Sequence, residues 1–193
     1  MFEGLDPPLL PVTAYAYESR LPSAIFYVAP PIRWAYRGLG ETVIALSYGP
    51  WMVLGSLYLH TGAASWGALW ASLVPGLLIM ALAVVNAIPD YHQDRLVGKR
   101  NLVVRLGRRR GVWLYLALAA AGFVVAAGGV AAGVFPFASL AALLALPLLA
   151  RSAQVGVRTY EAPRQFVPAI RAVVGCYLAA VALFGAGFLW PIG

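Results

Sequence analysis

The chain has 193 residues, of which 62% are hydrophobic and only 11% are charged, and its formal net charge is +7. Soluble domains carry about 25% charged residues, so this composition, with a mean hydropathy of +0.79, excludes an ordinary soluble protein and indicates an integral membrane protein. The single cysteine, Cys176, excludes an internal disulfide, and we expect it to be a small packing residue.

The N-terminal 22 residues are rich in proline and begin with the acidic stretch MFEGLDPPLLPV, which lacks the basic start of a signal peptide. We therefore expect two parts, a proline-rich segment over 1–22 and a membrane domain over 23–193. The apolar stretch Leu21–Ile32 contains three prolines and is too short to cross a bilayer, so we interpret it as the tail of a helix.

Four uncharged regions farther along the chain are long enough to cross a bilayer, which takes roughly 20 residues. The third, 111–150, is too long for one crossing, and GGVAAGVFPF near its middle predicts a hairpin. The sequence therefore predicts an all-α, polytopic transmembrane helix bundle with about five spanning helices. We expect them near residues 42–60, 66–93, 112–132, 136–152 and 170–190.

The basic residues are distributed unevenly between the two ends of these helices. All but one of the 14 Lys and Arg residues lie in three segments, which begin at Arg33, Arg95 and Arg151. Five helices place the three segments on one side of the membrane, and the positive-inside rule makes that side cytoplasmic. This placement favours a lipid membrane as the partner and argues against nucleic acid. The triplet Arg108–Arg110 is most simply a topology determinant beside anionic lipid, and an additional role with an anionic ligand stays open.

Two aspartates stand where the second long helix reaches this basic side. On a continuous helix, Asn86, Asp90 and Asp94 are four residues apart and line one stripe. Carboxylates at membrane depth are expensive and by default mark function. Carboxylate and amide oxygens suit Mg²⁺, which usually shares its shell with substrate phosphates. We therefore expect Asp90 and Asp94 to be metal ligands and catalytic residues, with a phosphorylated ligand completing the site.

Basic side chains follow the aspartates directly and provide donors for such a ligand. They are Arg95, Lys99, Arg100 and Arg105. A diphosphate needs positive donors of this kind to be stabilised as a leaving group. We expect Gly98 to end the helix and Pro89 to loosen it one turn before Asp94. The plainer alternative, in which the two aspartates only neutralise neighbouring arginines, stays open.

The pattern N-x-x-x-D-x-x-x-D-x-x-x-G-K-x-x-L-x-V-R-L-G, over Asn86–Gly107, resembles the second aspartate-rich motif of the UbiA superfamily of intramembrane prenyltransferases. The upstream stretch YVAPPIRWAYRGLGE and the late stretch FVPAIRAVVGCYLAAVALFGAGF are similar to the menaquinone branch, which contains 1,4-dihydroxy-2-naphthoate prenyltransferases. The resemblance covers about residues 24–190.

This resemblance implies Mg²⁺-dependent transfer of a polyprenyl group from a prenyl diphosphate to an aromatic quinone precursor such as 1,4-dihydroxy-2-naphthoate. The diphosphate leaves, an allylic cation forms, and the aromatic ring attacks it. Asp90 and Asp94 would hold Mg²⁺, and a second set of side chains would bind the diphosphate. That set is Asn86, Arg95, Lys99, Arg105, Tyr27, Arg33 and Tyr36. For the three that precede the first spanning helix, interfacial anchoring is an alternative.

Two departures from the family pattern keep a second function open. The menaquinone-type motif usually reads N-N-x-R-D, whereas this chain reads N-A-I-P-D. The family has about nine helices and an earlier N-D-x-x-D-x-x-x-D motif, which is not found here, so the five helices would match the last five. The alternative is a non-catalytic or split-half membrane module that binds prenyl diphosphate or a partner subunit without turnover. A partner subunit could then supply the first motif. A phosphatidyl-alcohol transferase would need a D-G-x-x-A-R start, which is absent.

Overall fold

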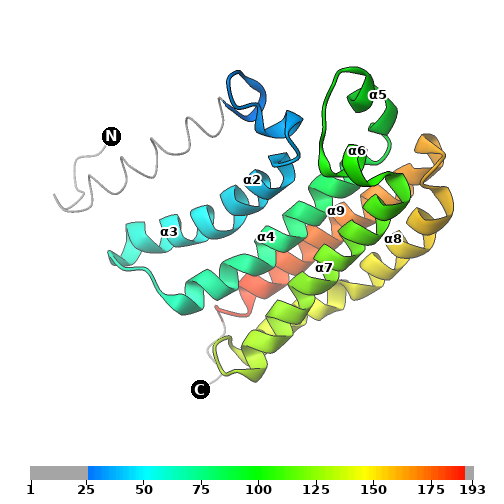
Figure 1. The fold of residues 1–193 in the computed structure, drawn as a ribbon. Helices are drawn as coiled ribbons and strands as arrows, with labels where there is room; N and C mark the ends of the chain where they lie inside the picture. The colour runs from blue at the N-terminus through cyan, green and yellow to red at the C-terminus, as the bar shows by residue number, and fades with distance from the viewer. Residues whose placement is uncertain (1–25, 190–193) are drawn as a thin grey trace.

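The computed structural model describes residues 26–189, and every regular element in that range is helical (Figure 1). The expected boundary between 1–22 and 23–193 lies outside the described residues. Within them, five helices are long and apolar enough to cross a membrane. These are Gly40–Thr61, Trp66–Ala87, Arg108–Ala131, Phe137–Thr159 and Pro163–Ala186. The predicted all-α polytopic bundle is therefore confirmed.

The first span is Gly40–Thr61, and it is built from three consecutive elements. They are α2 (Gly40–Leu46), the π-helical segment η2 (Ser47–Trp51) and α3 (Met52–Thr61). Pro50 lies inside the π-helical segment. Proline lacks the N–H that an α-helix needs and crowds the preceding turn, and a wider turn accommodates both defects. Gly62, at a φ of 68°, ends the span.

The other four spans form a bundle around α4 (Figure 1). Its elements are α4 (Trp66–Ala87), α7 (Arg108–Ala131), η3 (Phe137–Ala145) continued by α8 (Leu146–Thr159), and α9 (Pro163–Ala186). Both α7 and α9 pack against α4, and α9 also packs against η3 and α8. The last span begins at Pro163, well before the expected residue 170, because its first turns precede the apolar run from which the span was predicted.

A buried polar clamp joins three helices of the bundle. The hydroxyls of Tyr115 on α7 and Ser152 on α8 lie 3.1 Å apart, and Ser152 donates to the Ala169 carbonyl of α9 at 3.0 Å. Gly156 makes room for the phenol, because a Cβ at that position would lie 2.4 Å from the Tyr115 hydroxyl. Every buried polar group in this clamp is thus paired, as burial requires.

The first span lies beside this bundle. Its main contacts with the other spans are with α4. Two glycines allow the close approach. A Cβ at Gly49 would lie 2.7 Å from the Ser72 carbonyl oxygen and 2.8 Å from the Cα of Gly76. Many large apolar side chains of the span remain exposed, including Leu46, Tyr48, Trp51, Met52 and Leu59. The first span and α4 therefore meet along one seam that passes through Gly49 and Gly76, and much of the rest of the span is exposed.

Candidate active site

The helix that carries the aspartates is interrupted. The expectation of a continuous helix over 66–93 is wrong beyond Ala87, where α4 ends, and a separate helix α5 (Tyr91–Leu96) follows. Pro89 lies in the break, and because it has no N–H it cannot continue the α-helical ladder. The loosening expected from this proline is therefore a full break.

The break separates the three residues that were expected to share one stripe. Asn86 is exposed near the end of α4, and Asp90 is exposed at the start of α5, where its side chain makes no capping hydrogen bond. Asp94 is instead buried, with an exposed fraction of 8%. The structure thus brings Asn86 and Asp90 to the surface and turns Asp94 inward, so the two carboxylates have different surroundings.

Asp94 is the centre of a polar knot. Its Oδ1 accepts a 2.7 Å hydrogen bond from Lys99 Nζ, and its Oδ2 accepts one of 2.7 Å from Asn101 Nδ2. Gly98, at a φ of 76°, reverses the chain after α5 so that these two donors return to the carboxylate, as expected of a glycine at the end of a helix. The hydrogen bond that Lys99 donates to Asp94 raises the pKa of Lys99, so the lysine is positively charged here.

Asn101 was not predicted as a site residue. Its Oδ1 accepts from the Val104 amide at 2.8 Å, which caps α6 (Leu102–Leu106), while its amide nitrogen holds Asp94. The sequence signal that could have found it is an asparagine directly before an apolar stretch, the preferred residue for an N-cap. Both ends of this side chain are therefore used to fix the loop that carries Lys99.

Glu41 and Tyr27 approach the same loop from the N-terminal side. Glu41 is only 5% exposed, and its Oε1 accepts from the Leu102 amide at 3.0 Å. Tyr27 lies against the start of α2, because a Cβ at Gly40 would be 3.3 Å from its hydroxyl. Burial raises the pKa of Tyr27, and the nearby Glu41 carboxylate raises it further. Glu41 was also missed, although a charged residue opening an apolar span is a recognisable signal.

Arg105 fastens two chain segments together. Its Nε donates to the Arg100 carbonyl at 2.8 Å, and its Nη2 donates to the carbonyl of Arg37. Gly38 has a φ of 75° and lies against this guanidinium, where a Cβ would be 2.7 Å from Nε. The Arg100 amide also donates to the Tyr36 carbonyl at 3.2 Å. The expected contact of Arg105 with phosphate stays a prediction, and its guanidinium already has a structural role.

Arg33 and Tyr36 are paired with each other. The guanidinium carbon of Arg33 lies 3.9 Å from the Tyr36 ring centroid, and its Nε donates to the Val28 carbonyl at 3.3 Å. This arrangement is a cation–π contact near the surface. It leaves both the diphosphate role and the interfacial role predicted for these residues untested.

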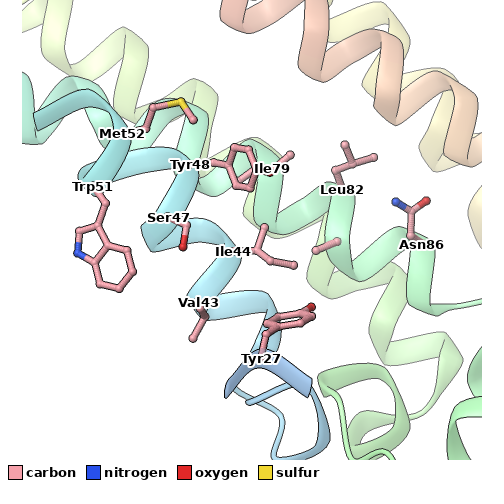
Figure 2. Close-up of a pocket in the computed structure, with 11 residues that line it drawn as sticks. Tyr27, Val43, Ile44, Ser47, Tyr48, Trp51, Met52, Ile79, Leu82 and Asn86 are labelled. Carbon is pink, nitrogen blue, oxygen red and sulfur yellow. The ribbon is translucent and has the colours of Figure 1, made fainter. Parts of the chain in front are cut away.

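Five of the predicted site residues line two hollows, and Asp90, Asp94, Arg33 and Tyr36 line neither. The first, here called the groove, has a volume of about 690 Å³ and lies between the first span and α4 (Figure 2). It is lined by Tyr27, Val43, Ile44, Ser47, Tyr48, Trp51, Met52, Ile79, Leu82, Ala83 and Asn86. Figure 2 shows Tyr27 and Asn86 at the end of the groove nearest the break after α4, with Trp51 and Met52 farther along. The groove is thus polar at one end and mainly apolar and aromatic along its length.

The second hollow, here called the basic pocket, has a volume of about 650 Å³. It is lined by Tyr91, Arg95, Gly98, Lys99, Arg100, Val104 and Arg105. Burial raises the pKa of Tyr27, and the positive charge of Lys99 acts in the opposite direction. The ammonium of the basic pocket is therefore within electrostatic reach of the phenol at the polar end of the groove.

A family model supplies the wider context for this geometry. The model described as the UbiA prenyltransferase family matches residues 11–174. The chain belongs to the UbiA prenyltransferase family. Five helices able to span a bilayer, together with this family, make it an integral membrane protein. No solved structure matches, so the correspondence with the last five of about nine helices stays a prediction.

Individual relatives from this family point to one branch. The chain is 25% identical over 167 residues to the 2-carboxy-1,4-naphthoquinone phytyltransferase of Synechocystis sp., covering 85% of the chain and 53% of the relative. It is 30% identical to the 1,4-dihydroxy-2-naphthoate octaprenyltransferase of Haemophilus influenzae, covering 86% and 54%, and 31% identical to that of Mycobacterium tuberculosis, covering 72% and 46%. The resemblance to the menaquinone branch is confirmed, and the chain spans about half the length of the curated relatives it matches.

The carboxylates of Asp90 and Asp94, which follow the break after α4, are oxygen donors of the kind that would bind Mg²⁺. Among residues 26–189, no three His, Cys, Asp or Glu side chains gather into a metal-binding group. Mg²⁺ is commonly held by one or two carboxylates, with water and substrate phosphates completing the shell. Asp90 is exposed to such an ion, whereas Asp94 is buried and each of its oxygens already accepts one hydrogen bond, which leaves one lone pair on each oxygen. The residues therefore fit a metal that arrives with a phosphorylated ligand.

Proposed function

We propose that this chain forms part of a menaquinone-type prenyltransferase, which transfers a polyprenyl group from a prenyl diphosphate to a naphthoate-type aromatic ring. The observation that carries the proposal is the placement of a largely apolar groove and a basic pocket at the same end of α4. A prenyl diphosphate has a long apolar chain and a strongly anionic head, so it requires two surfaces of these kinds in reach of each other. The names of the matched relatives support a naphthoate-type acceptor.

The basic pocket would bind the anionic head. Arg95 and Arg100 are exposed, and Lys99 keeps 34% of its side chain exposed while it is paired with Asp94. These cations would donate charge-assisted hydrogen bonds to phosphate oxygens. When the bond from the prenyl carbon to oxygen breaks, its electron pair leaves with the diphosphate, and fixed positive charges stabilise that product. Asp90 and Asp94 would hold Mg²⁺, which neutralises phosphate charge when bound, and Asn86 at the end of the groove would contact the diphosphate.

The groove would bind the apolar chain and exclude water from the allylic cation. Ile44, Met52 and Leu82 provide apolar walls, and Tyr27 stands at the polar end, nearest the departing head. A shielded surface matters because water would otherwise capture a reactive cation before the aromatic ring attacks it. The positive-inside rule would place this polar end on the cytoplasmic side of the membrane.

A second candidate function is a binding module without turnover, which includes half of a split enzyme. The observation that favours it is the state of Asp94, since both of its carboxylate oxygens are already paired with Lys99 and Asn101. Such a module would hold prenyl diphosphate in the basic pocket. A partner subunit would then supply further acidic residues for catalysis.

The test uses the full chain in lipid nanodiscs with radiolabelled geranylgeranyl diphosphate, with and without Mg²⁺. We expect Asp90→Asn to abolish the Mg²⁺-dependent part of ligand retention, because one of two metal-binding carboxylates is lost. Glu161→Gln is the matched control, since Glu161 is also an exposed acidic residue but lies between α8 and α9. Retention that is unchanged in Asp90→Asn contradicts the site. Retention without product, when 1,4-dihydroxy-2-naphthoate is added, supports the binding module instead of the enzyme.

A further inference from the structure

Glu41 is a buried carboxylate with only half of its hydrogen-bonding capacity used. Its Oε1 accepts from the Leu102 amide, while its Oε2 is buried and makes no hydrogen bond with the part of the chain that the structure describes. An ionised carboxylate that is removed from water requires donors to compensate for lost hydration. The second oxygen is therefore left without a donor from the described residues, and the carboxylate acts on its surroundings mainly through its charge.

Tyr27 places a hydroxyl beside this carboxylate. Its phenol lies against Gly40, the residue directly before Glu41, where an added Cβ would be 3.3 Å from the hydroxyl and 3.0 Å from the Ala35 Cα, a tight contact. The charge of Glu41 also acts on the phenol. On its other side, Tyr27 lines the polar end of the groove. The tyrosine thus stands between the buried carboxylate and the space proposed for substrate.

The backbone amide that donates to Glu41 is that of Leu102, in the loop beside the basic pocket. Leu102 is the first residue of α6, directly after the capping residue Asn101, and the amides of a first helical turn have no partner within their own helix. The same short loop carries Lys99, which lines the basic pocket. A single buried side chain therefore bridges the start of the first span and the loop of the basic pocket.

We propose that Glu41 is a positioning residue for prenyl transfer, which holds the Leu102 amide with one oxygen and presents its negative charge beside the phenol of Tyr27. It thereby fixes the groove and the basic pocket relative to each other. The effect of Glu41 on prenyl transfer rests on the proposed function, whereas its contact with the Leu102 amide does not. Glu41 acts through Tyr27 and through the loop that carries Lys99, and it contacts neither substrate itself.

The first experiment measures the bridge without any substrate. Hydrogen–deuterium exchange of the full chain in nanodiscs reports the Leu102 amide. We expect Glu41→Ala to accelerate its exchange by about tenfold or more, which corresponds to losing a hydrogen bond to a charged group. Glu41→Gln, which keeps an oxygen acceptor, should give a smaller increase. Unchanged exchange in both variants overturns the proposal, whether or not the protein turns over substrate.

A backbone variant isolates the same hydrogen bond. Leu102→Pro deletes the amide donor and replaces the side chain, and it should keep the helix, since proline is tolerated at the first position of a helix. Asn101, at φ −62° and ψ 172°, already has the extended backbone that a residue before proline prefers. Leu102→Ala controls for the lost side chain. We expect Leu102→Pro to raise the KM for prenyl diphosphate by about tenfold, with kcat within about twofold, and Leu102→Ala to leave both near wild type.

The Tyr27 contact is tested by a double-variant cycle. If the phenol and the carboxylate act together, Glu41→Gln combined with Tyr27→Phe should raise KM no more than the stronger single variant does. Independent effects that multiply overturn this half of the proposal. If the wild-type chain binds ligand but shows no turnover, the proposed function fails, and the cycle is then measured on ligand retention. The two failures are therefore distinguishable.

Discussion

The two sides of α4 differ in how completely they are packed. In the most apolar window of α4, 44% of the residues are buried, whereas the corresponding figure for the first span is 6%. On one side α4 contacts α7 and α9, and on the other it contacts the first span along a seam beside which the groove stays open. The candidate site therefore lies on the side of α4 where the neighbouring span is less buried.

The largest effect on stability is expected inside the bundle, from Gly156→Ala. A Cβ would lie 2.4 Å from the Tyr115 hydroxyl, and the buried ring cannot move without breaking the clamp to Ser152. Overpacking and one lost buried hydrogen bond together outweigh the helix propensity gained, so we expect the free energy of unfolding to fall by about 2 kcal/mol. Reversible unfolding in mixed micelles measures it.

Gly175→Ala is the matched control for that prediction. Gly175 also lies within a helix of the bundle, but the nearest atom to an added Cβ is Leu148 Cδ1 at 3.5 Å, an ordinary contact. We expect no loss of stability, and a gain of up to about 1 kcal/mol from helix propensity. Equal losses of stability in both variants would mean that the bundle is destabilised by any added methyl group, whether or not it lies near the clamp.

The spanning helices could be predicted from the sequence better than the way in which the first span packs on α4. The five spans were predictable because twenty-residue apolar runs have few alternatives in a membrane. The break at Ala87 was predicted only as a loosening, because Pro89 can kink or end a helix and the local sequence does not decide between them. The seam at Gly49 and Gly76 was not predicted, because packing partners are distant in the chain.

Within the candidate site, the residue types were more predictable than their partners. Asp94 and Lys99 were expected to bind ligand, yet here they bind each other, since the reversal at Gly98 brings them together. Asn101 and Glu41 were missed for the same reason. Their contacts join α5, α6 and the start of the first span, and one of them, from Glu41 to Leu102, crosses 61 positions of the sequence.

An intermediate effect is expected at the knot, from Asn101→Ser. Serine still caps α6 but cannot reach Asp94, so one hydrogen bond to a buried carboxylate is lost. We expect α5 and α6 to be destabilised by about 1.5 kcal/mol, measured as faster amide exchange over residues 94–106. Asn101→Ala also removes the cap and should lose about 1 kcal/mol more. If serine and alanine match the wild type, the knot does not hold the loop.

The smallest effect on stability, but a clear effect on binding, is expected at the seam from Gly49→Ala. The added Cβ would meet backbone atoms of Ser72 and Gly76 at 2.7 and 2.8 Å, and backbone cannot rotate away, so the first span must shift from α4. Because so little of this span is buried, we expect the free energy of unfolding to fall by less than about 1 kcal/mol. The groove changes width, however, so retention of geranylgeranyl diphosphate should drop about fivefold. Gly128→Ala, whose added Cβ meets no atom within 4 Å, should leave retention unchanged and should not lower stability. If Gly49→Ala instead destabilises the protein as much as Gly156→Ala does, the first span belongs to the packed core, and the contrast between the two sides of α4 fails.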